Sequence, residues 1–379
     1  MRAMEQILDL ARWAPSGDNT QPWRFEIRSD CEVLVHGYDT RDHVVYDLDG
    51  WASQISHGTL LESLSLAATR FGLRARTSIE DAAEAGRITY RVMLENDPAA
   101  TEDPLVAAIP ARCVQRRPMR PVRLTPDQRR ALEDAVRPYS VAWFESWRER
   151  WQVASLNSRN AHIRLTIPEA FAVHKAVIAW NATTSEDRLP DASLGADPVL
   201  LAVMRWAMVN WERASFLNRY LGGTAMPRLS MDFLPGLLCS AHFALIGPNE
   251  LDGIADRVAG GRAVQRFWLT ATRLNLQVQP SYTPLVFARY ARGQRHFTSV
   301  ERAEVTAREV AGRLDSLLGA PDAARTVFLG RIGPARATKA RSLRLPLDRL
   351  IVQSAPQRVF AITADMLDLK ACRREHDRR

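Results

Sequence analysis

The sequence predicts an α+β protein whose two halves are fused in one chain. Apolar patterns with helical and with strand spacing both occur, and two helical segments far apart in the chain resemble each other. The length of 379 residues and the hydrophobic content of 46% allow a substantial core and argue against a disordered or fibrous chain. We therefore expect two related halves that form an intrachain pseudodimer.

The first predicted element is an amphipathic helix, followed by a polar loop and a strand. The apolar positions of the helix are Met4, Ile7, Leu8 and Ala11. The pattern ends before the segment 15–23, which reads Pro-Ser-Gly-Asp-Asn-Thr-Gln-Pro-Trp, and a strand-like segment follows over 24–27. The prolines restrict the backbone, and the short polar side chains suit a polar planar ligand. The alternative interpretation is a plain polar connector.

The next elements form the internal repeat. The segments 66–73 and 269–276 share the tripeptide Ala-Thr-Arg at matching positions, and Gly58 falls opposite Gly261. Matching apolar stripes occupy Leu60, Leu61, Leu64, Ala68 and Phe71 in one segment and Ala263, Val264, Phe267, Ala271 and Leu274 in the other. Such stripes are typical of a buried helix face, and Gly72 and Asn275 both suit a left-handed cap. We favour duplication over a chance match of two amphipathic helices.

The second half begins with an arginine-rich segment and a helix. Arg112, Arg116 and Arg117 lie in this segment. In the helix that follows, Thr125 is a candidate N-cap and Gln128 is placed for a capping box. We expect the first half to span 1–103 and the second half 104–352, followed by a basic tail over 353–379.

A long insertion interrupts the second half between its first helix and its core strand over 237–246. We place this insertion at about 139–235 and expect it to be a helical lid with helices over 172–180 and 198–217. Six tryptophans lie within it: Trp143, Trp147, Trp151, Trp180, Trp206 and Trp211. Such aromatic residues either pack in a core or stack on an aromatic substrate.

Composition excludes several functional classes. The four cysteines and eight histidines show no metal-ligand spacing, so we expect no metal. The net charge of +8 includes the arginines of the tail, and no basic face interleaved with aromatic residues predicts a nucleic-acid partner. No apolar run reaches the roughly 20 residues of a membrane span, and the N-terminus lacks a signal-peptide core. We expect a cytoplasmic protein with no membrane partner.

Three segments together resemble the FMN-dependent nitroreductase family. The loop 15–23 is similar to the family's flavin-contacting Pro-Ser-x-x-Asn-x-Gln-Pro-Trp loop. The arginine-rich segment and Arg341-Ser-Leu-Arg-Leu-Pro-Leu-Asp over 341–348 resemble the family's two phosphate-binding segments. Residues 187–195 resemble a segment of the tandem Acg-like subgroup, whose members are single-flavin pseudodimers with a lid. The resemblance implies a three-layer α-β-α fold.

The resemblance also implies one composite FMN site per chain. The implied cofactor-binding residues are Pro15, Ser16, Asn19 and Gln21 at the ring, Arg112, Arg116, Arg117, Arg341 and Arg344 at the phosphate, and Pro280 and Ser281 near the N5 atom of the ring. Two departures from the family pattern are present. Val114 or Gln115 stands where a serine is usual, and Tyr282-Thr283 replaces a frequent Glu-Gly.

The function implied by the resemblance is that of an FMN-dependent oxidoreductase, active as a monomeric pseudodimer. NAD(P)H would supply hydride through the flavin to a nitro, quinone or other small aromatic or natural-product substrate, and no protein side chain is assigned a catalytic role. Two alternatives remain. One is an FMN-sequestering protein with a lid and little reductase activity, and the other is a flavin-free structural protein that leaves both arginine clusters unexplained.

Overall fold

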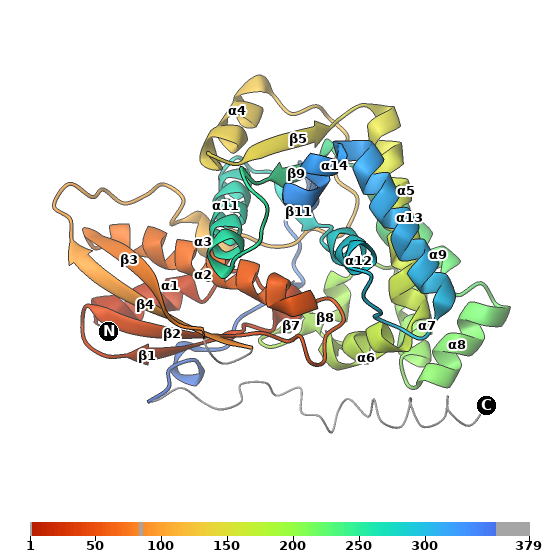
Figure 1. The fold of residues 1–379 in the computed structure, drawn as a ribbon, viewed down its shortest axis with the longest axis horizontal. Coiled ribbons are helices and arrows are strands. Elements are labelled where there is room, and N and C mark those ends of the chain that lie inside the picture. Colours follow the sequence, from red (N-terminus) through yellow and green to blue (C-terminus); the bar gives the residue numbers. More distant parts are fainter. Residues whose placement is uncertain (1, 83–85, 354–379) are drawn as a thin grey trace.

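The computed structural model of the chain describes residues 2–82 and 86–353 and contains two open, four-stranded sheets. All pairings within both sheets are antiparallel, and helices account for more of the chain than strands do. Figure 1 shows the first sheet at the lower left and the second above it, with two long helices between them. This mixed architecture agrees with the predicted α+β class.

The first half follows the order helix, strand, strand, helix, strand, strand. Its elements are α1 (Ala3–Ala11), β1 (Trp23–Ile27), β2 (Glu32–Tyr38), α2 (Trp51–Thr69), β3 (Leu73–Asp81) and β4 (Arg87–Asn96). The strands lie in the order β1-β2-β4-β3. The predicted apolar face of α1 is confirmed, because Met4, Ile7, Leu8 and Ala11 are buried in the core between the helices and this sheet.

The second half repeats this order of elements. Its corresponding elements are α4 (Pro126–Ala135), β5 (Ser140–Phe144), β9 (Ala241–Ile246), α11 (Ile254–Arg273), β10 (Gln277–Pro280) and β11 (Thr326–Gly333). Read from β5, the sheet order is β5-β9-β11-β10, so the second and fourth strands are central in both halves. The predicted capping box of α4 is confirmed, since the Thr125 side chain accepts from the Gln128 amide.

Helices cover both faces of the second sheet. Along β9, Phe243 and Leu245 pack with α11, whereas Ala244 and Ile246 face the opposite core, because alternate strand residues point to opposite faces. The opposite core includes residues of α5 (Trp147–Thr166), α12 (Thr283–Arg292) and α13 (Glu301–Leu318). In the sequence, α12, α13 and α14 (Ala320–Arg325) come between β10 and β11. This half therefore has three layers.

The helices α2 and α11 cross each other at a pair of glycines. A Cβ atom at Gly58 would overlap the carbonyl oxygen of Val258, and one at Gly261 would overlap the carbonyl oxygen of Ile55. The two glycines predicted to be equivalent thus make equivalent contacts. Both predicted left-handed caps are also confirmed, with φ of 64° at Gly72 and 57° at Asn275.

The insertion begins later than predicted. Residues 140–144 form strand β5, which pairs with β9 in the second sheet, so only the segment from α5 onward leaves the sheet. Its further helices are α6 (Pro168–Val177), α7 (Pro198–Ala207), α8 (Trp211–Tyr220), α9 (Ala225–Pro227) and α10 (Leu234–Leu237), with a π-helical turn η4 (Arg228–Phe233) before α10. The predicted helix over 198–217 is therefore two helices.

Short elements connect the two halves and the insertion. They are the 3-10 turns η1 (Gly17–Asn19), η2 (Leu48–Gly50), η3 (Asp191–Ser193) and η5 (Leu347–Arg349), the helix α3 (Ala108–Ala111), and the strands β6 (Ile178–Ala179), β7 (Thr184–Ser185), β8 (Leu189–Pro190) and β12 (Arg341–Ser342). β12 pairs with β7 of the insertion. The chain then returns to the first half, where Leu350 and Val352 bond the backbone of Phe25. The predicted basic tail lies, apart from Gln353, outside the described residues.

No helix in the described part of the chain is both long enough and apolar enough to cross a membrane.

Candidate functional site

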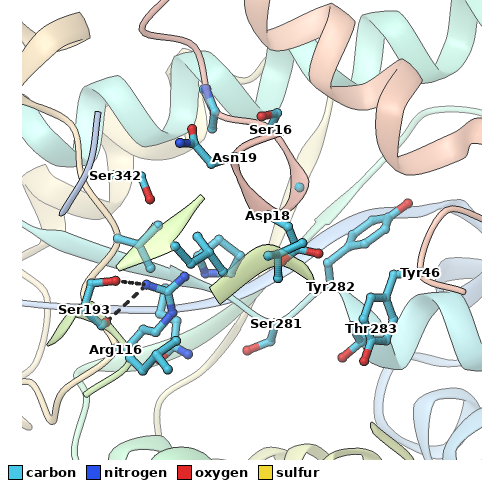
Figure 2. Close-up of a pocket in the computed structure, with 18 of the residues that line it drawn as sticks. Ser16, Asp18, Asn19, Tyr46, Arg116, Ser193, Ser281, Tyr282, Thr283 and Ser342 are labelled. Carbon is cyan, nitrogen blue, oxygen red and sulfur yellow. Dashed lines mark hydrogen bonds between the residues drawn. The ribbon is translucent and has the colours of Figure 1, made fainter. Parts of the chain in front are cut away.

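A cavity of about 430 Å³ lies where the first half, the second half and the insertion meet. This size falls within the usual range for small-molecule sites. Figure 2 shows residues from all three regions around it: Ser16 and Asn19 from the first half, Arg116 and Tyr282 from the second, and Ser193 from the insertion. The structure thus brings residues far apart in the sequence to one site.

Nine of the eleven residues predicted to bind the cofactor line this cavity. They are Pro15, Ser16, Asn19, Arg112, Arg116, Pro280, Ser281, Arg341 and Arg344. Gln21 and Arg117 do not line it. The loop and both arginine segments therefore face one space, as the composite arrangement requires.

The loop after α1 has an unusual backbone that is fixed by its own side chains. Asp18, Asn19 and Gln21 all have positive φ, which non-glycine residues adopt only when their surroundings hold them there. The Ser16 hydroxyl accepts a hydrogen bond from the Gln21 amide (2.9 Å), which closes the turn. In Figure 2 the loop descends to the cavity and presents Asp18 toward its centre.

Gln21 holds the structure together rather than facing the cavity. Its side chain is fully buried, and its Nε2 donates to the carbonyl oxygen of Glu186 in the insertion (2.8 Å). Its Oε1 accepts from the Leu345 amide (2.9 Å). Both ends of the side-chain amide are therefore occupied by the protein.

The nitrogen and the oxygen of the Asn19 side-chain amide have different surroundings. Its Nδ2 donates to the carbonyl oxygens of Glu186 (3.1 Å) and Arg188 (3.4 Å). Its buried Oδ1 has no hydrogen-bond partner among the described residues. A buried acceptor without a partner is costly, so this oxygen is suited to a donor on a bound ligand.

Three arginines form one end of the cavity: Arg112 and Arg344 are buried, and Arg341 is half-buried. Arg344 Nε donates to the carbonyl oxygen of Ala14 (3.0 Å), and Arg112 Nη2 donates to that of Trp13 (3.1 Å). Arg341 Nη2 donates to the carbonyl oxygen of Pro110 (2.9 Å). These bonds hold the guanidinium groups beside the start of the loop, although Arg112 Nε and Arg341 Nε remain buried without partners.

The charge of this arginine cluster is not balanced by the protein. No ion pair among the described residues includes Arg112, Arg341 or Arg344. Burial lowers the pKa of Arg112 to about 10, and burial together with the neighbouring arginines lowers the pKa of Arg344 well below its usual value. Buried charges are normally paired, so this cluster is suited to a bound anion.

The remaining two predicted arginines differ in position. Arg116 is directed into the cavity, where its Nη1 donates to the carbonyl oxygen of Ser193 (3.2 Å). Arg117 is exposed on the surface. Arg331, which was not predicted, holds the backbone at these two residues, because its buried guanidinium donates to the carbonyl oxygens of Arg116 (2.6 Å) and Arg117 (3.1 Å). A lone arginine in the apolar strand β11 was the available signal.

The wall opposite the loop is formed by the segment after β10. Ser281 is held by a hydrogen bond from its amide to the carbonyl oxygen of Leu329 (2.8 Å), and Pro280 precedes it at the end of the strand. Tyr282 and Thr283, which replace the frequent Glu-Gly, also line the cavity. This segment therefore presents side-chain oxygens as well as backbone to the site.

Polar groups from the insertion and from the first half line a further part of the cavity. His174 Nε2 and the Tyr46 hydroxyl lie 3.0 Å apart, and Arg164 forms an ion pair with Asp232 (2.9 Å). Asp18 faces this part, where burial raises the pKa of its carboxyl while Arg116 and Arg164 act in the opposite direction. None of these residues except Arg116 was predicted from the sequence, because they come from unrelated segments.

No group of three or more potential metal ligands occurs among the residues that the structure describes. No protein-family model and no curated protein matches the sequence.

Proposed function

We propose that the protein is an FMN-dependent, nitroreductase-like oxidoreductase that passes hydride from NAD(P)H to a nitro, quinone or other small aromatic substrate. The observation that supports this proposal most directly is the cluster of Arg112, Arg341 and Arg344. Two buried guanidinium groups and a half-buried one, with no carboxylate partner among the described residues, are suited to a phosphate monoester, which arginine binds through charge-assisted hydrogen bonds.

The residues at the rest of the cavity fit the flavin ring. Pro15, Ser16 and Asn19 would lie along the ring on one side and the segment at Pro280 and Ser281 on the other. Asn19 Oδ1, the buried acceptor without a partner, would take a hydrogen bond from the ring. FMN supplies the hydride and electron chemistry when bound, and the protein supplies position and charge.

We also propose that the two halves are copies of one nitroreductase-like unit and form a pseudodimer with a single site. The shared order of elements and strands supports duplication, as do the reciprocal contacts of Gly58 and Gly261. The first half supplies the loop and the second half the arginines. One FMN per chain follows from this division.

A second candidate function is FMN sequestration without reductase activity. It is favoured by the hydrogen bonds from Asn19 and Gln21 to Glu186 and by the pairing of β12 with β7, which fasten the insertion over the cavity. Anaerobic NADPH distinguishes the two functions. Rapid bleaching of the bound flavin supports the oxidoreductase, whereas a stable yellow spectrum supports sequestration.

The substitution Arg344→Ala tests the phosphate site. We expect wild type to hold about one FMN per chain, and we expect the variant to bind FMN roughly ten- to a hundredfold more weakly through loss of a charged hydrogen-bonding partner. Arg344→Lys should recover only part of this affinity, since a point charge cannot make a two-pronged contact. Fluorescence titration of the FMN-free protein measures these affinities.

Arg117→Ala is the matched control, because this arginine lies in the same cluster in sequence but is exposed outside the cavity. Its affinity for FMN should equal that of wild type. A protein that takes up no FMN would contradict the proposal, and an Arg344→Ala variant with wild-type affinity would remove this residue from the phosphate site.

A further inference from the structure

Helix α5 of the insertion presents a polar stripe to the cavity. Asn157, Asn160 and Arg164 are spaced by three and four residues, so they lie on one face of the helix, and all three line the cavity. The same helix buries Val153, Leu156 and Ile163 in the core. Two asparagines buried on an otherwise packed helix are unusual and call for hydrogen-bond partners.

The protein does not satisfy these two amides. Asn160 is only 2% exposed, and its Nδ2 lies 2.6 Å from the Thr283 hydroxyl, yet its Oδ1 has no partner among the described residues. Asn157 is 8% exposed and makes no side-chain hydrogen bond within the described part of the chain. Because an asparagine can present either end of its amide, the pair offers both a donor and an acceptor to the cavity.

The surroundings of the stripe select a neutral aromatic group. The apolar side chains of Val177, Ile178 and Met231 line the cavity from the insertion, and the ring of Tyr282 lines it from the second half. Arg164 at the end of the stripe is paired with Asp232, so it brings no uncompensated charge. A ring fits between the apolar groups, and a polar neutral substituent fits against the asparagines.

We propose that Asn157 and Asn160 form a subsite for a primary carboxamide on an aromatic ring. A carboxamide carries donors and an acceptor, so it complements a side-chain amide in either orientation of that amide. This subsite deepens the proposed function, and only its role rests on that function, since Asn160 bonds to Thr283 and not to the arginine cluster. The carboxamide could belong to the nicotinamide donor or to an amide-bearing acceptor.

Two pairs of probes test the subsite, and within each pair one amide NH₂ is replaced by CH₃. The first pair is nicotinamide and 3-acetylpyridine, and the second is 4-nitrobenzamide and 4-nitroacetophenone. Dissociation constants are measured on the purified protein by ligand-observed NMR titration. We expect the amide of at least one pair to bind roughly tenfold more tightly than its methyl ketone, the size of about one buried hydrogen bond. The pair that shows the preference identifies the source of the carboxamide.

The substitution Asn160→Leu should abolish the preference for the amide while the ketone binds as before. Asn157→Leu should lower the same preference. This variant decides the test if Asn160→Leu does not fold, because the Asn157 side chain makes no hydrogen bond to any residue that the structure describes. Asn218→Leu is the control: this asparagine also lies in the insertion, but it donates to the carbonyl oxygen of Leu165 and does not line the cavity.

The outcomes separate this proposal from the assignment of FMN. Equal binding of amide and ketone in both pairs would overturn the subsite, as would a preference that survives in the asparagine variants. A protein that prefers the amide but takes up no FMN would keep the subsite and reject the cofactor. A protein that binds FMN but shows no preference would do the reverse.

Discussion

His242 shows how a single side chain makes stability depend on pH. It lies in the central strand β9, is 1% exposed, and has its Nε2 2.8 Å from the carbonyl oxygen of Gly236. That contact requires a proton on Nε2, so the buried Nδ1 is the atom that would have to be protonated. Burial lowers the pKa of His242 to about 3, and Arg331 and Arg150 act in the same direction.

We predict that the free energy of unfolding falls as the pH decreases from 7 to 5. The unfolded chain binds a proton at His242 below about pH 6.5, whereas the folded chain stays neutral there until about pH 3, so acid favours the unfolded state. This one group contributes about 2 kcal/mol of loss between pH 7 and pH 5. Urea unfolding at both pH values measures it.

His242→Gln keeps a side-chain donor for Gly236 but does not titrate, so the loss between pH 7 and pH 5 should shrink. His296→Gln is the control because the His296 side chain is 92% exposed. An equal loss in wild type and His242→Gln would contradict the assignment of this histidine. His174, whose pKa burial also lowers to about 3, contributes separately and remains in both proteins.

At the same scale, the sequence predicted the chemistry of the loop better than its contacts. The polar loop and its short side chains were visible in the sequence, but Asn19 Nδ2 and Gln21 Nε2 both donate to the backbone carbonyl oxygen of Glu186 in the insertion. A backbone carbonyl leaves no side-chain pattern to read. Arg331 was missed for a related reason. Apart from one bond to Gln279 Oε1, its guanidinium donates to backbone carbonyl oxygens, those of Gln115, Arg116, Arg117 and Pro235.

At the scale of elements, helices with strong apolar periodicity were predicted correctly from the sequence, whereas the short strand β5 was not. The helices α1, α2, α4 and α11 were expected from apolar spacing and caps, and the predicted apolar positions within α1, α2 and α11 are buried. The polar side of α2 is buried as well, which its stripe did not predict. Strand β5 was included in the predicted insertion, and it has five residues, only one of which is buried. A short, partly exposed strand lacks the alternation that identifies strands, and it becomes a strand here by pairing with β9.

The crossing of α2 and α11 makes a second prediction. Gly58→Ala should destabilise the protein by at least the roughly 1–3 kcal/mol typical of overpacking, because the new methyl group would overlap the backbone of Val258 on the other helix. Gly312→Ala is the matched control in α13, where nothing lies within 4 Å of the new atom. That change should stabilise the helix by roughly 0.5–1 kcal/mol.

Thermal and urea unfolding of the two variants compare them directly. Equal free energies of unfolding for Gly58→Ala and wild type would show that α2 and α11 can move apart without loss of stability. This result would remove the main support for a shared interface between the halves. Gly261→Ala provides a second test of the same crossing, since its methyl group would overlap the carbonyl oxygen of Ile55.

At the scale of the whole molecule, neither half is complete alone. The core of the first half includes Val258, Leu345 and Leu350, and the core of the second half includes Ile55. The backbone of Phe25 in the edge strand β1 bonds to Leu350 and Val352 (both 2.9 Å). The repeated apolar pattern could be seen in the sequence, but these contacts between the two halves could not, because the residues involved are ordinary apolar ones.

We therefore predict that fragment 1–103 does not fold by itself. Without the second half, α2 would expose the face that packs against α11, and β1 would lose the chain segment that bonds to its edge. Circular dichroism during urea unfolding should show no cooperative transition for this fragment, whereas the full chain should show one. Co-expression of 1–103 with 104–353 should restore a folded pair, since the side-chain contacts between the described parts of the two halves are noncovalent. FMN uptake should appear only in that pair, because the loop and the arginine cluster come from different fragments.

A cooperative transition in isolated 1–103 would contradict this prediction. It would mean that the halves are independent domains and that the cavity forms only where two already folded domains touch.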